Sequence, residues 1–490
     1  MPRSLRAIAS CLAAVVPLTA CSTAEGTPKP PIATPTAVQG QAPADAHESP
    51  LSTDRARQSL GPVVSGGSVA PYNYVPSVLL DGGRYRVWWC SQLPGGGVSG
   101  DDVLTSAAAA LKGPFPDGAP VFGGSGGGFD AVHTCDPSVI RVNGTYYLYY
   151  TGAAGDAPYG NSIGVATSPD GLHWQRSAAN PIVTPSKDVL RPGNTYGAGQ
   201  PSVLHLDGWF YLMFTDTTGA AANDVGSGQF VLRSPDPTFA TGAQALTPNG
   251  FVSVKGTNAK RSLSVADAFS ADWMWVDALN AFAIGHEVGQ GTAISFWDKD
   301  FTTRPYADVV VAGKWNEGPG LVRRVDGHAP VSPDDACERV PVDLLRATRD
   351  GGGGPTDISS FGLDLTGVGG CRTPATTAGI AMPAPDRTVE MVVDGKLVRI
   401  ERRSVAEQLA LRVLDKPVPG VDSLPVAATI KAGAEVLHAP DRPYAFVAGG
   451  TLWPAGPPAV EADSAHVTEV SDAEWDARPK GGDLSAFRGN

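Results

Sequence analysis

The sequence predicts an all-β fold, a five-bladed β-propeller followed by a small, mainly β C-terminal domain. Three observations support this prediction. The chain of 490 residues holds 59 Gly and 43 Pro, and its apolar runs are short, which favours many strands joined by turns. A segment of strand, turn and strand recurs along the middle of the chain. Each copy is long enough for a four-stranded sheet, as in a propeller blade.

The first 20 residues have the form of an export signal. Arg3 and Arg6 precede an apolar run from Ile8 to Leu18. This run is shorter than the ~20 residues that a membrane-spanning helix needs, so we interpret it as the apolar part of a signal peptide. It ends at Ala20-Cys21, which resembles the lipobox of bacterial lipoproteins. That resemblance implies a lipid on Cys21 that holds the protein on the outer face of a bacterial membrane; the alternative is an ordinary secretory signal.

Residues 21–60 are expected to form a disordered linker. They are rich in Pro, Thr, Ala and Gln and poor in aromatic residues, so they cannot bury enough apolar surface to fold. The sequence has no second long apolar run. We therefore expect contact with the membrane only through the lipid.

The composition limits the partners and the cysteine chemistry. A net charge of -12 argues against nucleic acid, whose phosphates need a basic face. Besides Cys11 and Cys21, four cysteines remain, and an even number in an exported protein indicates disulfides. Three pairings are open. We favour Cys90 with Cys135 and Cys337 with Cys371, because the two cysteines of each pair are close along the chain.

The repeat is clearest in three copies. Each copy begins with Pro-Ser-Val and continues with an apolar strand, a turn containing Gly and an aromatic strand. The prolines Pro76, Pro137 and Pro201 are 61 and 64 residues apart (137−76; 201−137). Two weaker copies begin near Asp272 and Glu317. Five copies predict five blades over residues 61–375.

In residues 65–375 the motifs also resemble a known group. They are Asp136-Pro-Ser-Val, the aromatic stretch Gly144 to Gly152, Ser168-Pro-Asp-Gly-Leu-His-Trp174 and Glu317-Gly-Pro319. These resemble the five-bladed propeller glycosidases of the arabinanase and β-xylosidase group (glycoside hydrolase family 43). The resemblance implies a glycosidase that cleaves arabinose-, xylose- or related linkages and requires no cofactor. Some members carry a calcium in the channel, and no ligand spacing establishes one here.

A propeller places the start of each innermost strand near its axis. The residue before each Pro-Ser-Val should therefore face the funnel: Val75, Asp136 and Gln200. Asp272 and Glu317 are the candidates in blades 4 and 5. Glycosidic cleavage needs two carboxyl groups, one acid and one base or nucleophile, and Asp136 and Glu317 are the natural pair.

The family pattern is met only in part. Members carry a general-base Asp where Val75 stands and an acid Glu in a Glu-Gly-Pro motif, usually in the third blade, where Gln200 stands. From the resemblance we expect Asp136 to orient the sugar or tune the acid, and Glu317 to be the acid. Asp102 or Asp272 would be the base, with Asp101 in reserve. The alternative is a glycan-binding propeller without catalysis.

Other polar and aromatic side chains are candidates for sugar contact, and each could equally be structural: Gln200, His133, Tyr74, Tyr196 and His286. A phosphorylase on the same fold would need a basic pocket, for which the only nearby candidates are Arg191, Arg323 and Arg324.

The C-terminal domain is expected over residues 386–490, after a linker from Thr373 to Pro385. A hairpin around Asp394-Gly395, a helix within residues 404–414 and a helix starting after Ser471 are predicted. We favour packing on the propeller over a separate glycan site. We expect a monomer.

Overall fold

The computed structural model describes residues 48–68, 70–92, 101–155, 160–348 and 357–488. The signal peptide, Cys21 and most of the expected linker lie outside these residues. None of the helices in the described ranges is long and apolar enough to cross a membrane.

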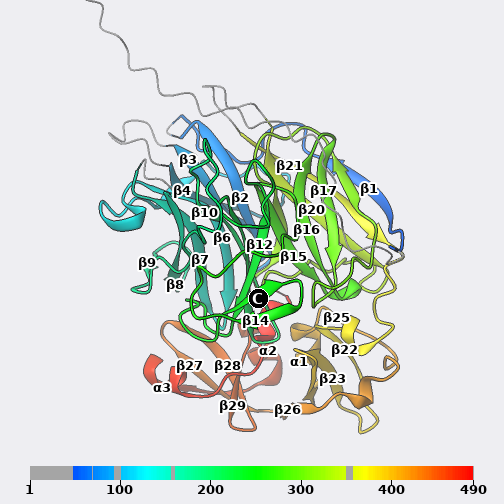
Figure 1. Ribbon diagram of the computed structural model, residues 1–490. Helices are drawn as coiled ribbons and strands as arrows, with labels where there is room; N and C mark the ends of the chain where they lie inside the picture. The colour runs from blue at the N-terminus through cyan, green and yellow to red at the C-terminus, as the bar shows by residue number, and fades with distance from the viewer. Residues whose placement is uncertain (1–47, 69, 93–100, 156–159, 349–356, 489–490) are drawn as a thin grey trace, which may run out of the picture. The chain divides into compact units, whose positions relative to one another are not determined.

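The propeller strands follow the five copies of the repeat and form five antiparallel blades; the innermost strands of blades 5 and 1 also pair in parallel, so these two blades form one eight-stranded sheet. Figure 1 labels many of these strands. Blade 1 comprises β2 (Tyr72–Asp81), β3 (Arg84–Gln92), β4 (Asp101–Ala108) and β5 (Ala119–Phe122). Blade 2 comprises β6 (His133–Val142), β7 (Thr145–Ala153), β8 (Asn161–Ser168) and β9 (Gln175–Arg176). Blade 3 comprises β10 (Ala198–Leu206), β11 (Trp209–Asp216), β12 (Gln229–Ser234), β13 (Gln244–Thr247) and β14 (Gly250–Ser253). Blade 4 comprises β15 (Ala271–Val276), β16 (Ala281–Val288), β17 (Gly291–Trp297) and β18 (Val309–Ala312).

Blade 5 is completed by the N-terminal part of the chain. It contains β19 (Gly320–Arg324), β20 (Arg339–Ala347), β21 (Ile358–Thr366) and, at its outer edge, β1 (Ser52–Gln58). Arg57 of β1 pairs with Asp343 at 2.6 Å and Asp364 at 2.7 Å. The expected linker of residues 21–60 therefore ends too late, because its last part is a propeller strand. The charged sequence of β1 lacks the apolar alternation by which strands are recognised.

A ladder of side chains joins the innermost strands around the axis. Ser77 accepts a hydrogen bond from the backbone N–H of Val139 in the next blade, at 3.0 Å. Ser138 and Ser202 repeat this contact with the two blades that follow. The guanidinium of Arg323 is fully buried on the axis and donates to all three hydroxyls at 3.4 Å. The serine of Pro-Ser-Val is thus a structural residue.

The channel is closed at one end. The segment after β19 accepts backbone hydrogen bonds from Arg141 of blade 2, His205 of blade 3 and Trp275 of blade 4. One segment therefore touches three blades where their innermost strands end. The candidate site is therefore sought at the other end, where these strands begin.

The C-terminal domain consists of two units with one topology. In each unit a three-stranded meander is followed by a helix and a strand that returns parallel to the first strand. The first unit comprises β22 (Ile380–Pro383), β23 (Val389–Val393), β24 (Lys396–Ile400), α1 (Arg403–Leu409) and β25 (Arg412–Val413), with β26 (Val426–Ile430) beside β24. The second comprises β27 (Glu435–Ala439), β28 (Arg442–Ala448), β29 (Thr451–Pro454), α2 (Pro457–Asp463) and β30 (His466–Glu469), followed by α3 (Asp472–Ala477).

The predicted local elements of this domain are present. The hairpin turns at Asp394-Gly395, where both residues have positive φ. The predicted helix at 404–414 is the shorter α1. Ser471 caps α3 by accepting a hydrogen bond from the N–H of Glu474.

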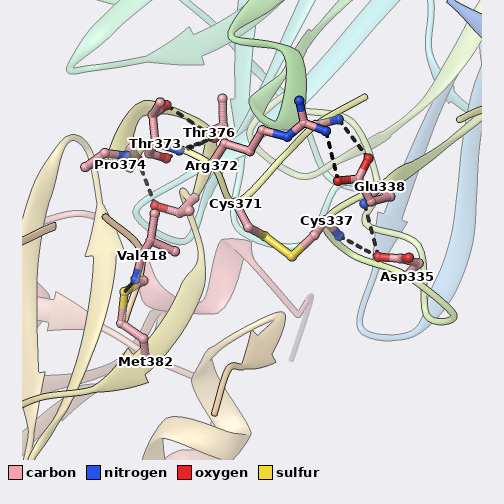
Figure 2. Close-up of a disulfide and its surroundings, with 12 residues drawn as sticks. Asp335, Cys337, Glu338, Cys371, Arg372, Thr373, Pro374, Thr376, Met382 and Val418 are labelled. Atoms are coloured by element: carbon pink, nitrogen blue, oxygen red, sulfur yellow. Dashed lines mark hydrogen bonds and ion pairs between the residues drawn. A yellow bond between two sulfur atoms is a disulfide. The ribbon is translucent and has the colours of Figure 1, made fainter. Parts of the chain in front are cut away.

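A disulfide marks the point where the propeller ends. Cys337, just before β20, is joined to Cys371, just after β21, with Cα atoms 5.2 Å apart (Figure 2). Asp335 accepts a hydrogen bond from the Cys337 N–H at 3.0 Å, and Glu338 pairs with Arg372. The other pairing favoured from the sequence, Cys90 with Cys135, is also found and joins blade 1 to blade 2.

Candidate active site

The innermost strands of blades 1 to 3 begin with the same backbone irregularity. Val75, Asp136 and Gln200 have φ of 43°, 50° and 52°, and the register with the second strand shifts at this point. Positive φ is costly for residues other than glycine, above all for a β-branched one. Val75 and Gln200, with Ser270 and Gly318, line a cavity of ≈ 10 Å³ on the axis, so these positions face the channel as predicted.

The structure corrects the alignment of blades 4 and 5. In blade 4, Asp272 stands where the other blades carry serine, since its carboxylate accepts from the N–H of Leu321 at 2.7 Å. It also bonds the Ser202 hydroxyl and lies 3.3 Å from Arg323. Asp272 is therefore part of the axial ladder, although it also lines the axial cavity, and its role as a catalytic base stays a prediction. Ser270 occupies the position before the missing proline.

In blade 5 the residue just before the proline is not the predicted Glu317 but the residue after it. Gly318, with φ of 52°, takes the position before the proline, so Glu317 lies one residue further from the closed end of the channel. An added Cβ at Gly318 would lie 2.9 Å from the Val75 side chain, which explains the glycine. Glu317 itself is buried.

Asp136 and Glu317 converge on two tyrosines. The Tyr196 hydroxyl donates to Asp136 at 3.0 Å. Burial, then the charges of Asp136 and Glu317, raise the pKa of Tyr196 well above its usual value. Burial and the charges of Asp101, Asp136 and Glu317 do the same to the pKa of Tyr74. Both phenols therefore stay protonated, and three carboxylates from three blades lie within electrostatic range of them.

We call Asp101, Asp136 and Glu317 the carboxylate cluster. Tyr74 donates to Asp101, and His133 Nδ1 lies 3.8 Å from the same carboxylate. Asp102, the predicted alternative base, instead packs against Gly123 and accepts a hydrogen bond from Gly124. Side chains alternate along a strand, so only one of the two adjacent aspartates can reach Tyr74, and it is Asp101.

Two other side chains predicted to contact sugar, Gln200 and His286, have different surroundings. Gln200 accepts from the Ser270 hydroxyl, its N–H donates to the Thr151 hydroxyl at 2.8 Å, and it lines the axial cavity. His286 does not join the cluster. Burial lowers its pKa, and the charges that act on it are those of Asp308, Arg304 and Asp267.

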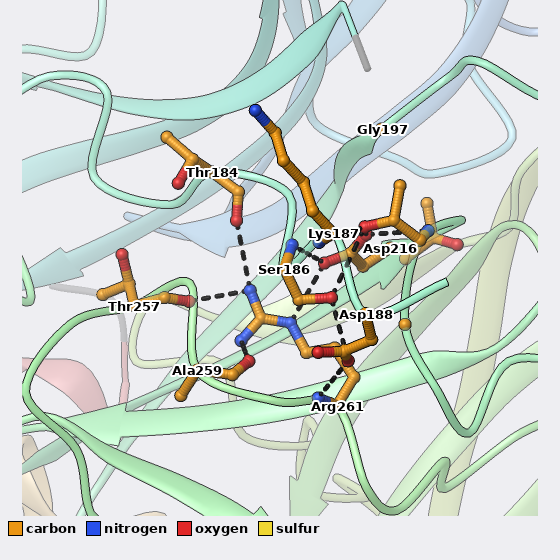
Figure 3. A network of polar contacts seen from close by, with 12 residues as sticks. Thr184, Ser186, Lys187, Asp188, Gly197, Asp216, Thr257, Ala259 and Arg261 are labelled. Carbon is orange, nitrogen blue, oxygen red and sulfur yellow. Dashed lines mark hydrogen bonds and ion pairs between the residues drawn. The ribbon is translucent and has the colours of Figure 1, made fainter. Parts of the chain in front are cut away.

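A buried ion pair holds the wall that carries Tyr196. Arg261 Nε lies 3.1 Å from Asp216, and both side chains are almost fully buried. Figure 3 shows Arg261 also donating to the carbonyls of Thr257 and Ala259, while Asp216 accepts from the N–H of Ser186. The network thus ties the loop before Tyr196 to the end of β11 and to the loop before blade 4.

The predicted phosphate-binding arginines do not form one pocket. Arg191 donates to four backbone carbonyls, those of Thr217, Gly219, Ala222 and Asn223. Arg323 is on the axis, and Arg324 pairs with Asp277 and Asp326. These arginines are structural, which removes the basis of the phosphorylase reading. The ion-pair partners of Arg323 and Arg324 are aspartates, and Glu317 is not among them.

One group in the described ranges has the spacing of metal ligands, namely Cys90, Asp101 and Cys135. Its two sulfur atoms form a disulfide and so cannot act as thiolate ligands. The structural calcium implied by the resemblance stays a prediction.

The sequence interpretation overlooked Glu287, the residue after His286. It is half-buried at the end of β16, and burial raises the pKa of its carboxyl group to about 7.

Comparisons with known proteins give structural likenesses only. No family model matches the chain, and no curated protein matches it. Among solved structures, a family 117 glycoside hydrolase of Zobellia galactanivorans is 12% identical over 64% of this chain and 91% of its own, with a TM-score of 0.44. A GH43_1 enzyme of Xanthomonas citri, complexed with xylotriose, is 15% identical over 69% and 94%, with a TM-score of 0.41. The α-L-arabinofuranosidase of Podospora anserina is 13% identical over 64% and 97%, with a TM-score of 0.40. Glycoside hydrolases of family 43, the group that the sequence motifs resemble, are thus among the structures to which this chain is similar.

Proposed function

We propose that the protein is a glycoside hydrolase whose active site is the carboxylate cluster at the open end of the propeller. The observation that carries this proposal is the pair of buried carboxyl groups, Asp136 of blade 2 and Glu317 of blade 5, where the innermost strands of their blades begin, with Asp136 held by the Tyr196 hydroxyl. Glycosidic cleavage requires two carboxyl groups on either side of the scissile bond. Blades that meet at one axis supply them from distant parts of the chain.

The tyrosines orient this site. Tyr74 and Tyr196 donate hydrogen bonds to Asp101 and Asp136, and their raised pKa values keep both phenols protonated in alkaline solution as well as at neutral pH. Tyr196 also packs edge-on against Phe269 at 4.7 Å between ring centroids. Aromatic rings beside carboxylates suit a sugar, whose C–H face packs on a ring while its hydroxyls bond the acids.

Arabinose-, xylose- or related linkages are the proposed substrates, on the strength of the sequence motifs. We further propose that a lipid on Cys21 holds the enzyme on the outer face of the membrane. Metabolic labelling with an alkyne fatty acid tests this anchor: the native chain should be labelled, and Cys21→Ser should not.

A second candidate function is glycan binding without cleavage. Val75 and Gln200 favour it, because the related glycosidases carry an acidic residue at each of these two positions. Binding would then use the same tyrosines and amides, and Asp136 would serve only as a hydrogen-bond acceptor.

Sugar release separates the two functions. The full chain should release sugar from a panel of arabinans, xylans and bacterial envelope polysaccharides, and Asp136→Asn and Glu317→Gln should each lose this activity while unfolding at the wild-type temperature. Glu461→Gln, an exposed position in α2, is the matched control and should stay active. A glycan that raises the melting temperature without being cleaved would favour the binding module instead.

A further inference from the structure

The two units of the C-terminal domain are copies of each other in sequence as well as in topology. Ala384-Pro-Asp-Arg387 recurs as Ala439-Pro-Asp-Arg442, and the hairpin turn Asp394-Gly395 recurs as Gly449-Gly450, each 55 residues further along the chain (439−384; 450−395). All four residues of the two hairpin turns have positive φ. The two units can therefore be compared residue by residue.

The second unit carries a pair of rings that the first unit lacks. Pro383 and Val389 are cross-strand partners in β22 and β23, and their counterparts 55 residues further on are His438 and Tyr444. These two rings stack, with centroids 4.2 Å apart and planes 16° apart. Glu469 holds Nδ1 of His438 at 2.9 Å, and both rings belong to partly buried residues. Since the first unit folds without them, the fold does not require this pair.

The ring pair lines a cavity of ≈ 490 Å³, which we call the outer cavity, between the second unit and blade 2. This volume lies within the ~300–1,000 Å³ that is usual for small-molecule sites. Around the cavity the two walls touch: Arg141 of β6 lies 3.5 Å from the Ser485 hydroxyl, and an added Cβ at Gly144 would lie 2.4 Å from the Pro443 ring. The outer cavity is thus an open space between surfaces that otherwise pack together.

The charged groups that line the outer cavity balance one another. They are two arginines, Arg141 and Arg442, and two aspartates, Asp170 and Asp441. Arg141 donates to Asp81 at 2.9 Å, but its buried Nε has no hydrogen-bond partner among the described residues. Buried donors are nearly always satisfied, so an acceptor from outside the chain, such as a hydroxyl group, suits this position. A balanced set of charges favours a neutral ligand over an anionic or a cationic one.

The uncharged part of the lining suits a sugar ring. Tyr146 of β7 faces the cavity from the propeller, and His438 and Tyr444 face it from the second unit. A sugar packs its C–H face on an aromatic ring, while its hydroxyl groups both donate and accept hydrogen bonds. An acyl chain, by contrast, would leave two arginines and two aspartates facing apolar carbon, which is unfavourable.

We propose that the outer cavity is a second carbohydrate site, which binds one neutral sugar residue of a polysaccharide chain. It is separate from the carboxylate cluster, because Asp136 lies near the start of β6 and Arg141 near its end. The C-terminal domain then holds the glycan on the enzyme in addition to packing on the propeller. Binding at this site does not depend on whether the propeller cleaves the glycan.

Isothermal titration calorimetry tests the site. The probes are xylohexaose, arabinohexaose and N-acetylchitohexaose, added to the full chain with Glu317→Gln so that the probe stays intact. Tyr444→Val, which introduces the residue of the first unit, and His438→Ala should each weaken binding of at least one probe by ~10-fold or more, with unchanged melting. His466→Ala, an exposed histidine in β30 of the same unit, is the matched control and should bind as before.

A further variant separates this site from the propeller funnel. Asp136→Asn should leave intact the binding that Tyr444→Val removes. Binding that survives both Tyr444→Val and His438→Ala, or that disappears with Asp136→Asn, would assign the sugar to the funnel and overturn the second site. Failure of every probe to bind would overturn it as well. A wild type that binds through Tyr444 and His438 but cleaves no glycan would refute the proposed function and leave this inference standing.

Discussion

Breaking the axial ion pair should cost much of the stability of the propeller and none of its chemistry. Arg323 is fully buried and contacts Asp272 at 3.3 Å, the hydroxyls of Ser77, Ser138 and Ser202, and two backbone carbonyls. Arg323→Met removes these hydrogen bonds and leaves the Asp272 carboxylate without its cation. Asp272→Asn leaves the guanidinium without its anion.

The magnitude follows from the distance and the burial. Unit charges 3.3 Å apart attract by about 5 kcal/mol at an effective dielectric constant of 20. Removing one partner of a buried pair typically costs ~3–5 kcal/mol, because the other charge stays buried and uncompensated. We therefore expect each single variant to lose ~3–5 kcal/mol of unfolding free energy. The double variant should lose less than the sum of the two, since it leaves no lone charge.

Urea unfolding of the wild type, the two single variants and the double variant, monitored by tryptophan fluorescence, measures these free energies as a double-mutant cycle. Asp272→Asn should also keep the wild-type kcat on any substrate that the chain cleaves. Losses below ~1 kcal/mol that add without coupling would contradict the ladder. A folded, stable Asp272→Asn without activity would confirm Asp272 as a catalytic residue.

Three further predictions concern the site and the blade closure. The pKa of Glu287 is raised from 4.5 to about 7, so its contribution to stability is complete below pH 4.5 and is lost as pH rises through 7. Glu287→Gln should therefore be up to about 3 kcal/mol more stable than wild type at pH 8 and equally stable near pH 4, as measured by denaturant unfolding at both values; a pH-independent difference would contradict this. Tyr196→Phe removes the donor to Asp136 and should lower kcat/KM by ~10–100-fold, as expected for a hydrogen bond to a charged group, with unchanged thermal unfolding; unchanged kinetics would remove Tyr196 from the site. A chain that starts at residue 61 lacks β1 and the Arg57 ion pairs, so it should melt below a chain that starts at 48 and aggregate through the exposed edge of β21; equal melting of the two chains would show that β1 is dispensable.

The repeat predicted most of the propeller because its signal is local. The glycine turn and the aromatic strand reflect contacts within one blade, and Pro-Ser-Val recurs because each blade makes the same contact with the next, so blades 1 to 3 could be aligned from the sequence. Blade 4 has Ala271-Asp272 in place of Pro-Ser. Without the proline, nothing in the sequence shows that the aspartate replaces the serine as acceptor in the ladder.

The errors in the site share one physical cause. Whether a carboxylate faces the channel depends on its exact position along a strand: a shift of one residue reverses the face of every side chain, and a shift of two moves the side chain along the same face. Asp272 was aligned two residues from its place in the ladder, and of the adjacent Asp101 and Asp102 the one that bonds Tyr74 is Asp101. Asp136 and Glu317 were found because a proline-containing motif marks each of them.

The closure of blade 5 could not be predicted locally either. β1 is mostly exposed and owes its place to pairing with β21 and to ion pairs with residues 286 and 307 positions away in the sequence. Its composition therefore resembles that of the linker before it. The disulfides were predictable only because each joins two cysteines that follow one another in the order of cysteines along the chain.

The most direct test of the central claim is the proton NMR spectrum of a polysaccharide panel incubated with the full chain. Cleavage by the carboxylate cluster predicts new anomeric signals of a reducing sugar from at least one arabinan, xylan or envelope glycan, and their absence with Asp136→Asn and Glu317→Gln. Unchanged spectra for every glycan, with a well-folded chain that still binds one of them, would show that the propeller keeps its fold and its tyrosine-lined mouth without hydrolysis.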